Sequence, residues 1–431
     1  MKKLNLIELN EINFEIVDKY VSSQPGEFPG FEKLLDLVKL TSSSEKVYEL
    51  LEPWIQWPSV HTCQTFDKHK IFRLGDIINY KGDQIFEKIE NAGYMVGCVS
   101  PMNADNNLKN PAYFIPDPWT NTQSDNSKIS TALHQALKQA VNDNSEGKVE
   151  LSTYITFFWI LLTRTQIKNW FTFLKLFLLR KKRWNKALFL DLLLADVFMY
   201  LKSKNNENFS CLFLNAFAHV QHHYFLNSKM YDGCLKNKPE YINDSDDPIL
   251  DTIRIYDRII LDLLNKYDEK FVFATGLRQV PVDEQIVYYR LKNHEKFLKS
   301  LGVKNFVVEP RMTRDFLVKF NKLNDLEDAF KILSKTEYKR IQLFGEIEKR
   351  RNSLFITLTF SNVIGTNDVL STQNESLNLS EEFVFVANKN AHHDSLGYVF
   401  TNFIPHILKT GDHVCNVGSE ILHYFNIADS K

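Results

Sequence analysis

Apolar and polar positions alternate along the chain in a way that divides it into short strand-like and helix-like segments. Residues 3–9 alternate apolar with polar positions, and residues 94–99 and 211–214 are short apolar runs, which predicts three buried strands. Helical spacing is found at residues 31–40, 84–92 and 248–267, and residues 401–410 are expected to form a closing helix. Further strands are expected at residues 46–51, 270–274 and 353–360, and a loop at residues 103–125. Strands that alternate with helices predict an α/β fold with a layered, mostly parallel sheet and helices on both faces.

The middle of the chain has a different pattern. Residues 151–202 are helical in spacing and rich in aromatic side chains, with an unbroken apolar run at residues 154–162 and a basic cluster at residues 180–183. The apolar run is shorter than the roughly 20 residues that span a bilayer. Two interpretations follow, either an inserted helical cap or a basic aromatic surface that lies on a membrane or holds a lipid-linked substrate.

These patterns predict five parts. Residues 1–150 would form the first part of the α/β core, residues 151–204 a helical insertion that acts as a cap, and residues 205–281 the second part of the core. Residues 282–360 would form a small accessory or lid region of α+β type, and residues 361–431 would complete the core with a late His motif.

Composition narrows the class of protein. A chain of 431 residues with 44% hydrophobic residues can bury a large core, and a net charge of −1 gives no support to nucleic-acid binding. The five cysteines are scattered, which favours a reducing compartment. Glu8, Glu11 and Glu15 stand where a signal peptide would be apolar. We therefore expect a cytoplasmic protein, with membrane association through residues 151–202 as an option.

The densest group of chemically active side chains follows the apolar run at residues 211–214. If the chain turns helical there, Asn215 and His219 are four residues apart, and so are His219 and His223, so that each pair shares a helix face. An amide oxygen and imidazoles so placed can bind one cation. The alternative is that these are ordinary, partly buried side chains.

Other strand ends carry candidates of the same kind. Glu8 closes the first strand and is either a ligand or part of a solvated strand end. Residues 52–62, with two tryptophans and two prolines, resemble the wall of a pocket, in which Ser59 and Thr62 are either reactive hydroxyls or helix caps. Late in the chain, His392 and His393 form a His-rich turn.

The order of these motifs resembles the alkaline phosphatase superfamily, and most closely its type I phosphodiesterase/nucleotide pyrophosphatase branch. The motifs are an acidic residue after the first strand, a Pro-Ser-x-His-Thr loop, an Asn-xxx-His element, a helix–strand–turn unit and a late His-rich turn. The resemblance covers nearly the whole chain. It implies a layered α/β sheet whose strand ends carry two metal ions, usually zinc, beside a Thr or Ser nucleophile.

Transferred to this sequence, the resemblance implies one set of metal ligands, namely Glu8, Asn215, His219 and one of His392 or His393. The second metal site is degenerate. The residues Thr275-Gly276-Leu277-Arg278 stand where the family has Ser/Thr-Asp-His-Gly, so that both ligands are missing.

The nucleophile position of the family falls near Glu52 and Pro53, where no hydroxyl is present. Ser59 or Thr62 would then act from a shifted loop, Glu52 would have become a further ligand, or the phospho-enzyme route is lost. A bound cation would polarise a phosphoryl oxygen, and three arginines would offset charge on the phosphate, namely Arg278, Arg311 and Arg314.

Three functions are compatible with these features. The first is a metal-dependent phosphoric-ester hydrolase or phosphoryl-group transferase that uses zinc, or alternatively manganese, on a phosphorylated small molecule or a lipid-linked glycan. The second is a non-catalytic descendant that binds a phosphorylated or lipid-linked ligand. The third is an interaction protein that docks on a membrane.

Overall fold

The chain forms two compact units. The computed structural model describes residues 2–142, 150–310, 314–372 and 375–428. The described residues up to Pro281 and from Ala391 onward form unit 1, and Val282–Asn390 form unit 2. Strands β7 (Arg278–Leu291) and β16 (Phe383–Asp394) pair with each other and each contribute residues to both units.

Unit 1 is built on a mostly parallel sheet, as the sequence predicts. Among the described residues its strand order is β18-β2-β17-β6-β1-β5-β3-β4. All neighbouring pairs are parallel except those of β17, which runs antiparallel to both β2 and β6. The strands are β1 (Leu4–Leu9), β2 (Val38–Ser43), β3 (Val96–Val99), β4 (Tyr113–Ile115), β5 (Phe209–Leu214), β6 (Lys270–Ala274), β17 (Leu396–Thr401) and β18 (Asp412–His413).

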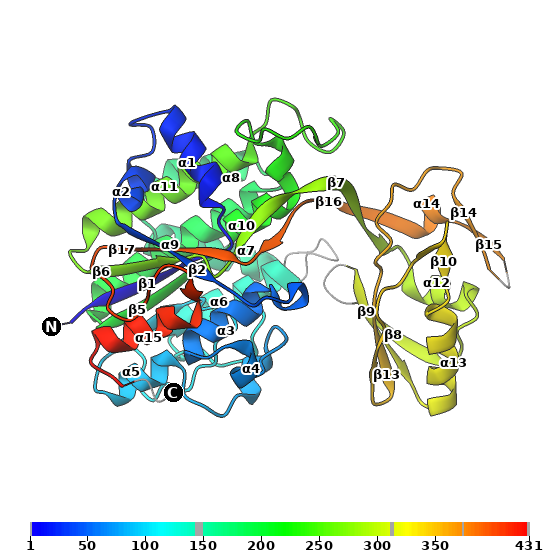
Figure 1. Ribbon diagram of the computed structural model, residues 1–431, viewed down its shortest axis with the longest axis horizontal. Coiled ribbons are helices and arrows are strands. Elements are labelled where there is room, and N and C mark those ends of the chain that lie inside the picture. Colours follow the sequence, from blue (N-terminus) through cyan, green and yellow to red (C-terminus); the bar gives the residue numbers. More distant parts are fainter. Residues whose placement is uncertain (1, 143–149, 311–313, 373–374, 429–431) are drawn as a thin grey trace. The chain divides into compact units, whose positions relative to one another are not determined.

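Helices cover both faces of this sheet (Figure 1). The alternation along β1 shows why, since Leu4 and Leu6 enter one hydrophobic cluster while Ile7 and Leu9 enter another. The first cluster is completed by α3 (Pro53–Thr62), α5 (Ile85–Asn91) and α15 (Cys415–Tyr424). The second is completed by α1 (Phe14–Ser23), α2 (Pro29–Leu35), α6 (Lys128–Asn142), α9 (Asn185–Asn205), α10 (Ala216–Tyr224) and α11 (Pro248–Lys266). Unit 1 also contains α4 (Phe66–His69), η1 (Tyr48–Leu50), η2 (Asp76–Asn79) and η5 (Phe225–Asn227).

The expected helical segment begins with α7 (Leu151–Arg164), η4 (Ile167–Asn169) and α8 (Trp170–Leu178). These three elements carry many exposed aromatic and aliphatic side chains. The following helix, α9, is buried along most of its length and packs on β5 and β3. None of the helices in the described residues combines the length and the apolar composition needed to cross a bilayer.

Unit 2 has its own core around a four-stranded antiparallel sheet in the order β12-β13-β9-β8. These strands are β8 (Phe306–Pro310), β9 (Asp315–Phe320), β12 (Glu348–Arg350) and β13 (Ser353–Thr357). The remaining elements are α12 (His294–Ser300), α13 (Leu323–Leu333), α14 (Leu379–Glu382), β10 (Glu337–Tyr338), β11 (Ile341–Gln342), β14 (Val369–Ser371) and β15 (Ser376–Asn378).

The predicted helices at residues 84–92 and 248–267 are confirmed as α5 and α11, but two neighbouring predictions are wrong. The helix expected at residues 31–40 ends at Leu35, because the chain then joins the sheet as β2. The strand expected at residues 46–51 contains η1 instead, and the chain continues directly into α3, whose first residue is Pro53. Proline favours the first turn of a helix because its fixed φ suits that position.

Two predictions elsewhere in unit 1 also fail. The loop expected at residues 103–125 contributes β4 to the sheet edge. The closing helix is α15 rather than residues 401–410. In that segment the Glu420 carboxylate accepts hydrogen bonds from the backbone N–H groups of His406, Ile407 and Leu408, and this pairing holds the segment outside a helix.

Candidate metal centre

Three side chains from distant parts of unit 1 meet at the carboxyl end of the sheet. Glu11 follows β1, His222 lies on α10, and His393 lies near the end of β16. Oε2 of Glu11 is 3.2 Å from Nε2 of His222 and 3.0 Å from Nε2 of His393, and the two Nε2 atoms are 3.3 Å apart. Among the His, Cys, Asp and Glu side chains of the described residues, these three have ligand atoms close enough together to hold one metal ion. We call it the Glu11–His222–His393 cluster.

Glu11 is held in an unusual backbone conformation. Its φ of 60° lies in the left-handed region, which residues other than glycine rarely adopt. Its backbone N–H donates to the Thr275 carbonyl at 3.1 Å, and its carbonyl accepts from the backbone N–H of Gln279 at 3.2 Å and from Nε2 of Gln221 at 2.8 Å. Strain of this kind persists where the surroundings over-determine the conformation, which is common at functional sites. The effect here is to aim the Glu11 carboxylate at the two histidines.

The local sequence explains how His222 reaches the cluster. β5 ends at Leu214, Asn215 is the N-cap position, and α10 starts at Ala216. Gln221, the residue before His222, is fully buried. Its side chain donates to the Glu11 carbonyl and accepts from the backbone N–H of Asn13 at 2.9 Å. These bonds lock α10 against the chain that follows β1. The side chain of His222 remains 34% exposed, so the cluster is open to solvent on that side.

His393 is oriented through its other ring nitrogen. Nδ1 lies 3.4 Å from Oε2 of Glu52, and the ring also hydrogen bonds to the backbone of Leu51. With the Nδ1 proton directed at these acceptors, Nε2 faces Glu11 and His222. Metal-binding histidines are usually fixed in this way by a carboxylate or carbonyl behind the ring.

The electrostatics of the cluster suit an exchange between a proton and a cation. Burial alone would raise the pKa of Glu11, but His393 and His222 hold it well below its usual range. Burial alone would lower the pKa of His393, but the carboxylates of Glu11 and Glu52 raise it to about 9. The metal-free cluster therefore keeps a proton on His393 at neutral pH, and a divalent cation would replace that proton.

The spacing of the three donor atoms fits a metal ion. Zinc binds His nitrogen and carboxylate oxygen at about 2.0–2.2 Å, so tetrahedral geometry places neighbouring ligand atoms about 3.4 Å apart. The observed separations of 3.0, 3.2 and 3.3 Å are close to this value. Three protein ligands leave one coordination position for water or substrate, which is the arrangement of catalytic zinc sites.

Glu8, expected as a ligand, is directed elsewhere. Its side chain points to the sheet face covered by α3, because side chains alternate along β1. There Oε1 lies 2.6 Å from Nε2 of His61 and 3.3 Å from Sγ of Cys211, and all three side chains are fully buried. Glu8 thus lies outside the Glu11–His222–His393 cluster.

The candidates on α10 divide between two environments. Nδ2 of Asn10 donates to Oδ1 of Asn215 at 2.8 Å and to Oε1 of Glu11 at 2.9 Å, so Asn215 adjoins the cluster through Asn10. His219 and His223 face each other with ring centroids 4.7 Å apart. Burial lowers the pKa of His219 to about 4 and holds the pKa of His223 well below its usual value, so both rings are neutral at pH 7.

The two late histidines and Glu52 also differ in their positions relative to the Glu11–His222–His393 cluster. His393 joins the cluster, whereas the ring of His392 lies 6.5 Å from that of Tyr48. Glu52 contacts His393 behind the ring, as a partner of a ligand, at 3.4 Å from Nδ1.

Ser59 and Thr62 both lie inside α3 and are fully buried. The Thr62 hydroxyl donates to the Pro58 carbonyl at 2.7 Å, and the Ser59 hydroxyl donates to the Ile55 carbonyl at 3.0 Å. His69 lies 3.0 Å from Ser59, but its Nδ1 accepts from the backbone N–H of Ile71, so Nε2 carries the proton and donates to Ser59. In this arrangement His69 cannot take a proton from Ser59.

The three arginines differ in their positions. Arg278 follows β6, where Nε donates to Asp394 at 2.8 Å and Nη1 donates to Glu15 at 2.5 Å. Arg278 thus pairs with the residue that follows His393 in β16. Arg314 belongs to unit 2, where it stacks 3.9 Å above the ring of Tyr288, and Arg311 lies outside the described residues.

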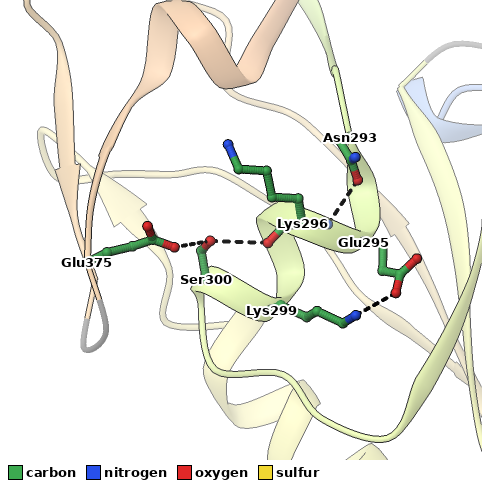
Figure 2. A pocket seen from close by; sticks show the side chains of 6 residues that line it. All are labelled: Asn293, Glu295, Lys296, Lys299, Ser300 and Glu375. Carbon is green, nitrogen blue, oxygen red and sulfur yellow. Dashed lines mark hydrogen bonds and ion pairs between the residues drawn. The ribbon is translucent and has the colours of Figure 1, made fainter.

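A separate surface hollow of about 460 Å³ lies in unit 2 (Figure 2). Its charged groups have partners within unit 2, as in the 2.6 Å contact between Lys299 and Glu295 and the ion pair of Lys296 with Glu382. Asn293 caps α12 through the Lys296 backbone N–H at 2.9 Å, and Ser300 donates to the Lys296 carbonyl at 3.1 Å. We assign this hollow no role in the metal centre.

Sequence reasoning undervalued two members of the cluster. Glu11 was visible as a carboxylate just beyond the end of the first strand, where parallel sheets carry their chemistry, whereas Glu8 lies within the strand. His222 does not belong to the pair His219 and His223, which are four residues apart, so helical spacing did not select it. The sequence showed only that it lies on the helix that follows a strand end. The signal that would have favoured both is their position relative to the strand ends rather than their spacing.

Comparison with known proteins gives similarity only at the level of three-dimensional structure. No family model and no curated protein matches this chain. Murine ectonucleotide pyrophosphatase/phosphodiesterase 5 is similar over 99% of this chain and 96% of its own, with 10% identity and a TM-score of 0.47. Phosphonoacetate hydrolase from Sinorhizobium meliloti 1021, in complex with phosphonoformate, covers the same shares with 12% identity and a TM-score of 0.44.

Alkaline phosphatase from the Antarctic bacterium TAB5 is similar over 99% of both chains, with 8% identity and a TM-score of 0.40. The names of two of these neighbours, an ectonucleotide pyrophosphatase/phosphodiesterase and an alkaline phosphatase, are those of the enzymes that the sequence motifs resemble. With identities of 12% or less and TM-scores below 0.5, the similarities assign no residue role and no activity to this chain.

Proposed function

We propose that this protein is a metal-dependent phosphoric-ester hydrolase or phosphoryl-group transferase. The observation that carries the proposal is the convergence of Glu11, His222 and His393, whose donor atoms lie 3.0–3.3 Å apart. We infer that these three residues bind one divalent cation, with zinc as the first choice and manganese as the alternative. A cation at this position would polarise a phosphoryl oxygen and lower the pKa of a bound water.

The surrounding residues would each contribute to such a reaction. Glu52 would keep the Nδ1 proton of His393 in place and so keep Nε2 available to the cation. Arg278 would offset charge on a phosphate oxygen with the guanidinium N–H donors that its contacts with Asp394 and Glu15 leave available. We infer that water, or the hydroxyl group of an acceptor, is the attacking group, because the hydroxyls of Ser59 and Thr62 are buried and engaged inside α3.

A phosphorylated small molecule is the proposed substrate, and a lipid-linked glycan phosphate is a more specific version. The location proposed is the cytoplasm. The five cysteines all lie in the described residues and form no disulfide there, which is compatible with a reducing compartment.

A second function, binding without catalysis, is favoured by one observation. In the metal-free cluster, protonated His393 between Glu11 and His222 already forms a complete ion pair. Such a cluster would be stable without a cation, so the protein could keep this arrangement while it binds a phosphorylated ligand without catalysis.

Two measurements on purified protein separate these functions. Elemental analysis is expected to find about one zinc or manganese per chain, and bis(4-nitrophenyl) phosphate should be hydrolysed at a rate that falls after dialysis against a chelator and returns with the metal. A metal-bearing protein without turnover would support the binding function. A protein that retains no zinc, manganese or other divalent metal even after incubation with excess metal would overturn the metal centre.

A further inference from the structure

A large apolar surface is exposed on α7, η4 and α8. Of the twenty-six exposed large hydrophobic side chains in the described residues, twelve fall within this one segment of unit 1. Phe158 is 63% exposed, Ile167 and Phe171 are each 77% exposed, and Leu178 is 68% exposed. The others are Leu151, Tyr154, Ile155, Leu162, Trp170, Leu174, Phe177 and Leu179. We call this surface the α7–α8 face. A concentration of this kind marks an interaction site rather than ordinary surface.

The charge of the same segment is entirely positive. Residues 151–190 contain eight Lys and Arg residues and no Asp or Glu. Some of these charges are anchored to neighbouring elements, as in the ion pair of Lys182 with Asp246 at 2.6 Å. Lys175, Arg180, Lys181 and Arg183 are exposed. The α7–α8 face therefore combines apolar side chains with a basic rim.

We propose that the α7–α8 face docks on the surface of a lipid bilayer that contains acidic lipids. Exposed Phe, Trp, Ile and Leu side chains would enter the boundary between headgroups and acyl chains, as in amphipathic helices that lie in the membrane interface. Each Lys or Arg close to an acidic membrane surface adds to the electrostatic attraction. The helices would lie on the membrane, because α7 has 14 residues and α8 has 9, whereas a spanning helix needs about 20.

Charge also decides between a membrane and a second copy of this chain. Two α7–α8 faces packed together would bring the exposed basic residues of one copy, Lys175, Arg180, Lys181 and Arg183, close to those of the other, and residues 151–190 contain no carboxylate to offset them. An acidic bilayer supplies both the opposite charge and the apolar depth. We therefore commit to the lipid surface.

The chain that follows the basic end of the α7–α8 face contacts α10, the helix that carries His222. Trp184 follows the basic residues and packs on Tyr224 of α10, with ring centroids 5.2 Å apart. The same helix carries His222. Docking would thus bring phosphate-bearing headgroups alongside the helix that contributes a metal ligand, which makes a membrane lipid phosphate the proposed substrate class. This last step rests on the proposed function, whereas docking itself does not.

Sedimentation with vesicles tests the docking. The full chain is expected to bind vesicles of phosphatidylcholine with about one third phosphatidylglycerol, to bind pure phosphatidylcholine about tenfold less, and to lose binding as salt rises. The double variant Phe158→Ser/Phe171→Ser and the double variant Arg180→Glu/Lys181→Glu should each reduce binding at least about tenfold. Both pairs are exposed, so we expect unchanged thermal unfolding.

Matched controls lie in unit 2. Val307→Ser/Leu323→Ser removes two exposed apolar side chains, and Lys304→Glu/Lys322→Glu makes the same change of charge outside residues 151–190. Both controls should bind as the parent does. The proposal is overturned if the parent binds neither kind of vesicle at low salt, if the α7–α8 variants bind as well as the controls, or if sedimentation equilibrium shows a dimer that Phe158→Ser/Phe171→Ser dissociates. Metal content and hydrolysis of a soluble diester are read separately, so failure of docking and failure of the metal centre are distinguishable.

Discussion

The Nε2 atoms of His222 and His393 lie 3.3 Å apart although the two residues are 171 positions apart in the sequence. Two imidazoles so close, with a carboxylate oxygen of Glu11 within 3.2 Å of both, would repel each other if both were protonated. One shared proton or one metal ion resolves this conflict. The metal content of the purified protein distinguishes a shared proton from a bound metal ion.

Replacement of His222 by Ala should remove the bound metal and lower phosphodiesterase activity more than about 100-fold, because only two protein ligands would remain. The side chain is 34% exposed, so the free energy of unfolding of the metal-free protein should change little. Elemental analysis and turnover of bis(4-nitrophenyl) phosphate check this. His406→Ala, which changes an exposed histidine away from the cluster, is the control and should keep both metal and activity. Unchanged metal content in His222→Ala would contradict the assignment.

Replacement of Glu52 by Gln should weaken metal binding by about 10–100-fold without abolishing it, because Glu52 holds the ring of His393 rather than the cation. A competition titration against a chelating dye measures the affinity. Glu49→Gln changes an exposed carboxylate three residues away and should leave the affinity unchanged. Complete loss of metal in Glu52→Gln would instead make Glu52 a ligand.

Replacement of Thr62 by Val should leave activity within about threefold of the parent and cost about 1 kcal/mol of stability through the lost hydrogen bond to Pro58. The reason is that the hydroxyl is buried within α3. Initial rates and urea unfolding check the two effects. A different result, namely loss of several orders of magnitude in rate with metal retained and recovery in Thr62→Ser, would identify Thr62 as a covalent nucleophile.

Replacement of Glu87 by Gln should change how stability depends on pH. Burial raises the pKa of Glu87 from its ordinary value of 4.5 to about 7. The folded state therefore holds this proton more tightly than the unfolded chain does, so the stabilisation is complete below pH 4.5 and is lost as the pH rises through 7.

Gln at this position keeps a neutral side chain in the capping box that begins α5. Glu87→Gln should exceed the parent by up to about 3 kcal/mol in free energy of unfolding at pH 8 and equal it near pH 4. Urea unfolding at both pH values measures the difference, with Glu27→Gln, an exposed carboxylate, as the control. A variant that is less stable than the parent at both pH values would show that the ionised carboxylate is required for the cap.

Several elements could be predicted because their sequences carry the signal locally. The run of residues 270–274 is apolar and short, and it forms β6 with these bounds. Residues 248–267 repeat apolar positions at helical spacing, and Asp247 with Pro248 mark the start of α11, where the Asp247 side chain accepts from the Leu250 backbone N–H at 3.1 Å. β2 was missed because its first two residues are exposed and its alternation is weak, so only pairing with β17 fixes it as a strand.

The sequence by itself determined that polar side chains follow β1 and β5 and that a late His-rich turn exists, because hydrophobic patterning ends the strands at those points. Only the tertiary structure decided which side chains meet. Glu8 and Glu11 are both carboxylates near the end of β1, but the alternation of the strand turns Glu8 toward His61 under α3, while the left-handed backbone at residue 11 turns Glu11 toward α10. Both Glu11 and His222 contact His393, which is 382 residues from Glu11 and 171 residues from His222 in the sequence. The sheet brings the three to one edge, and no local sequence pattern encodes contacts over such separations.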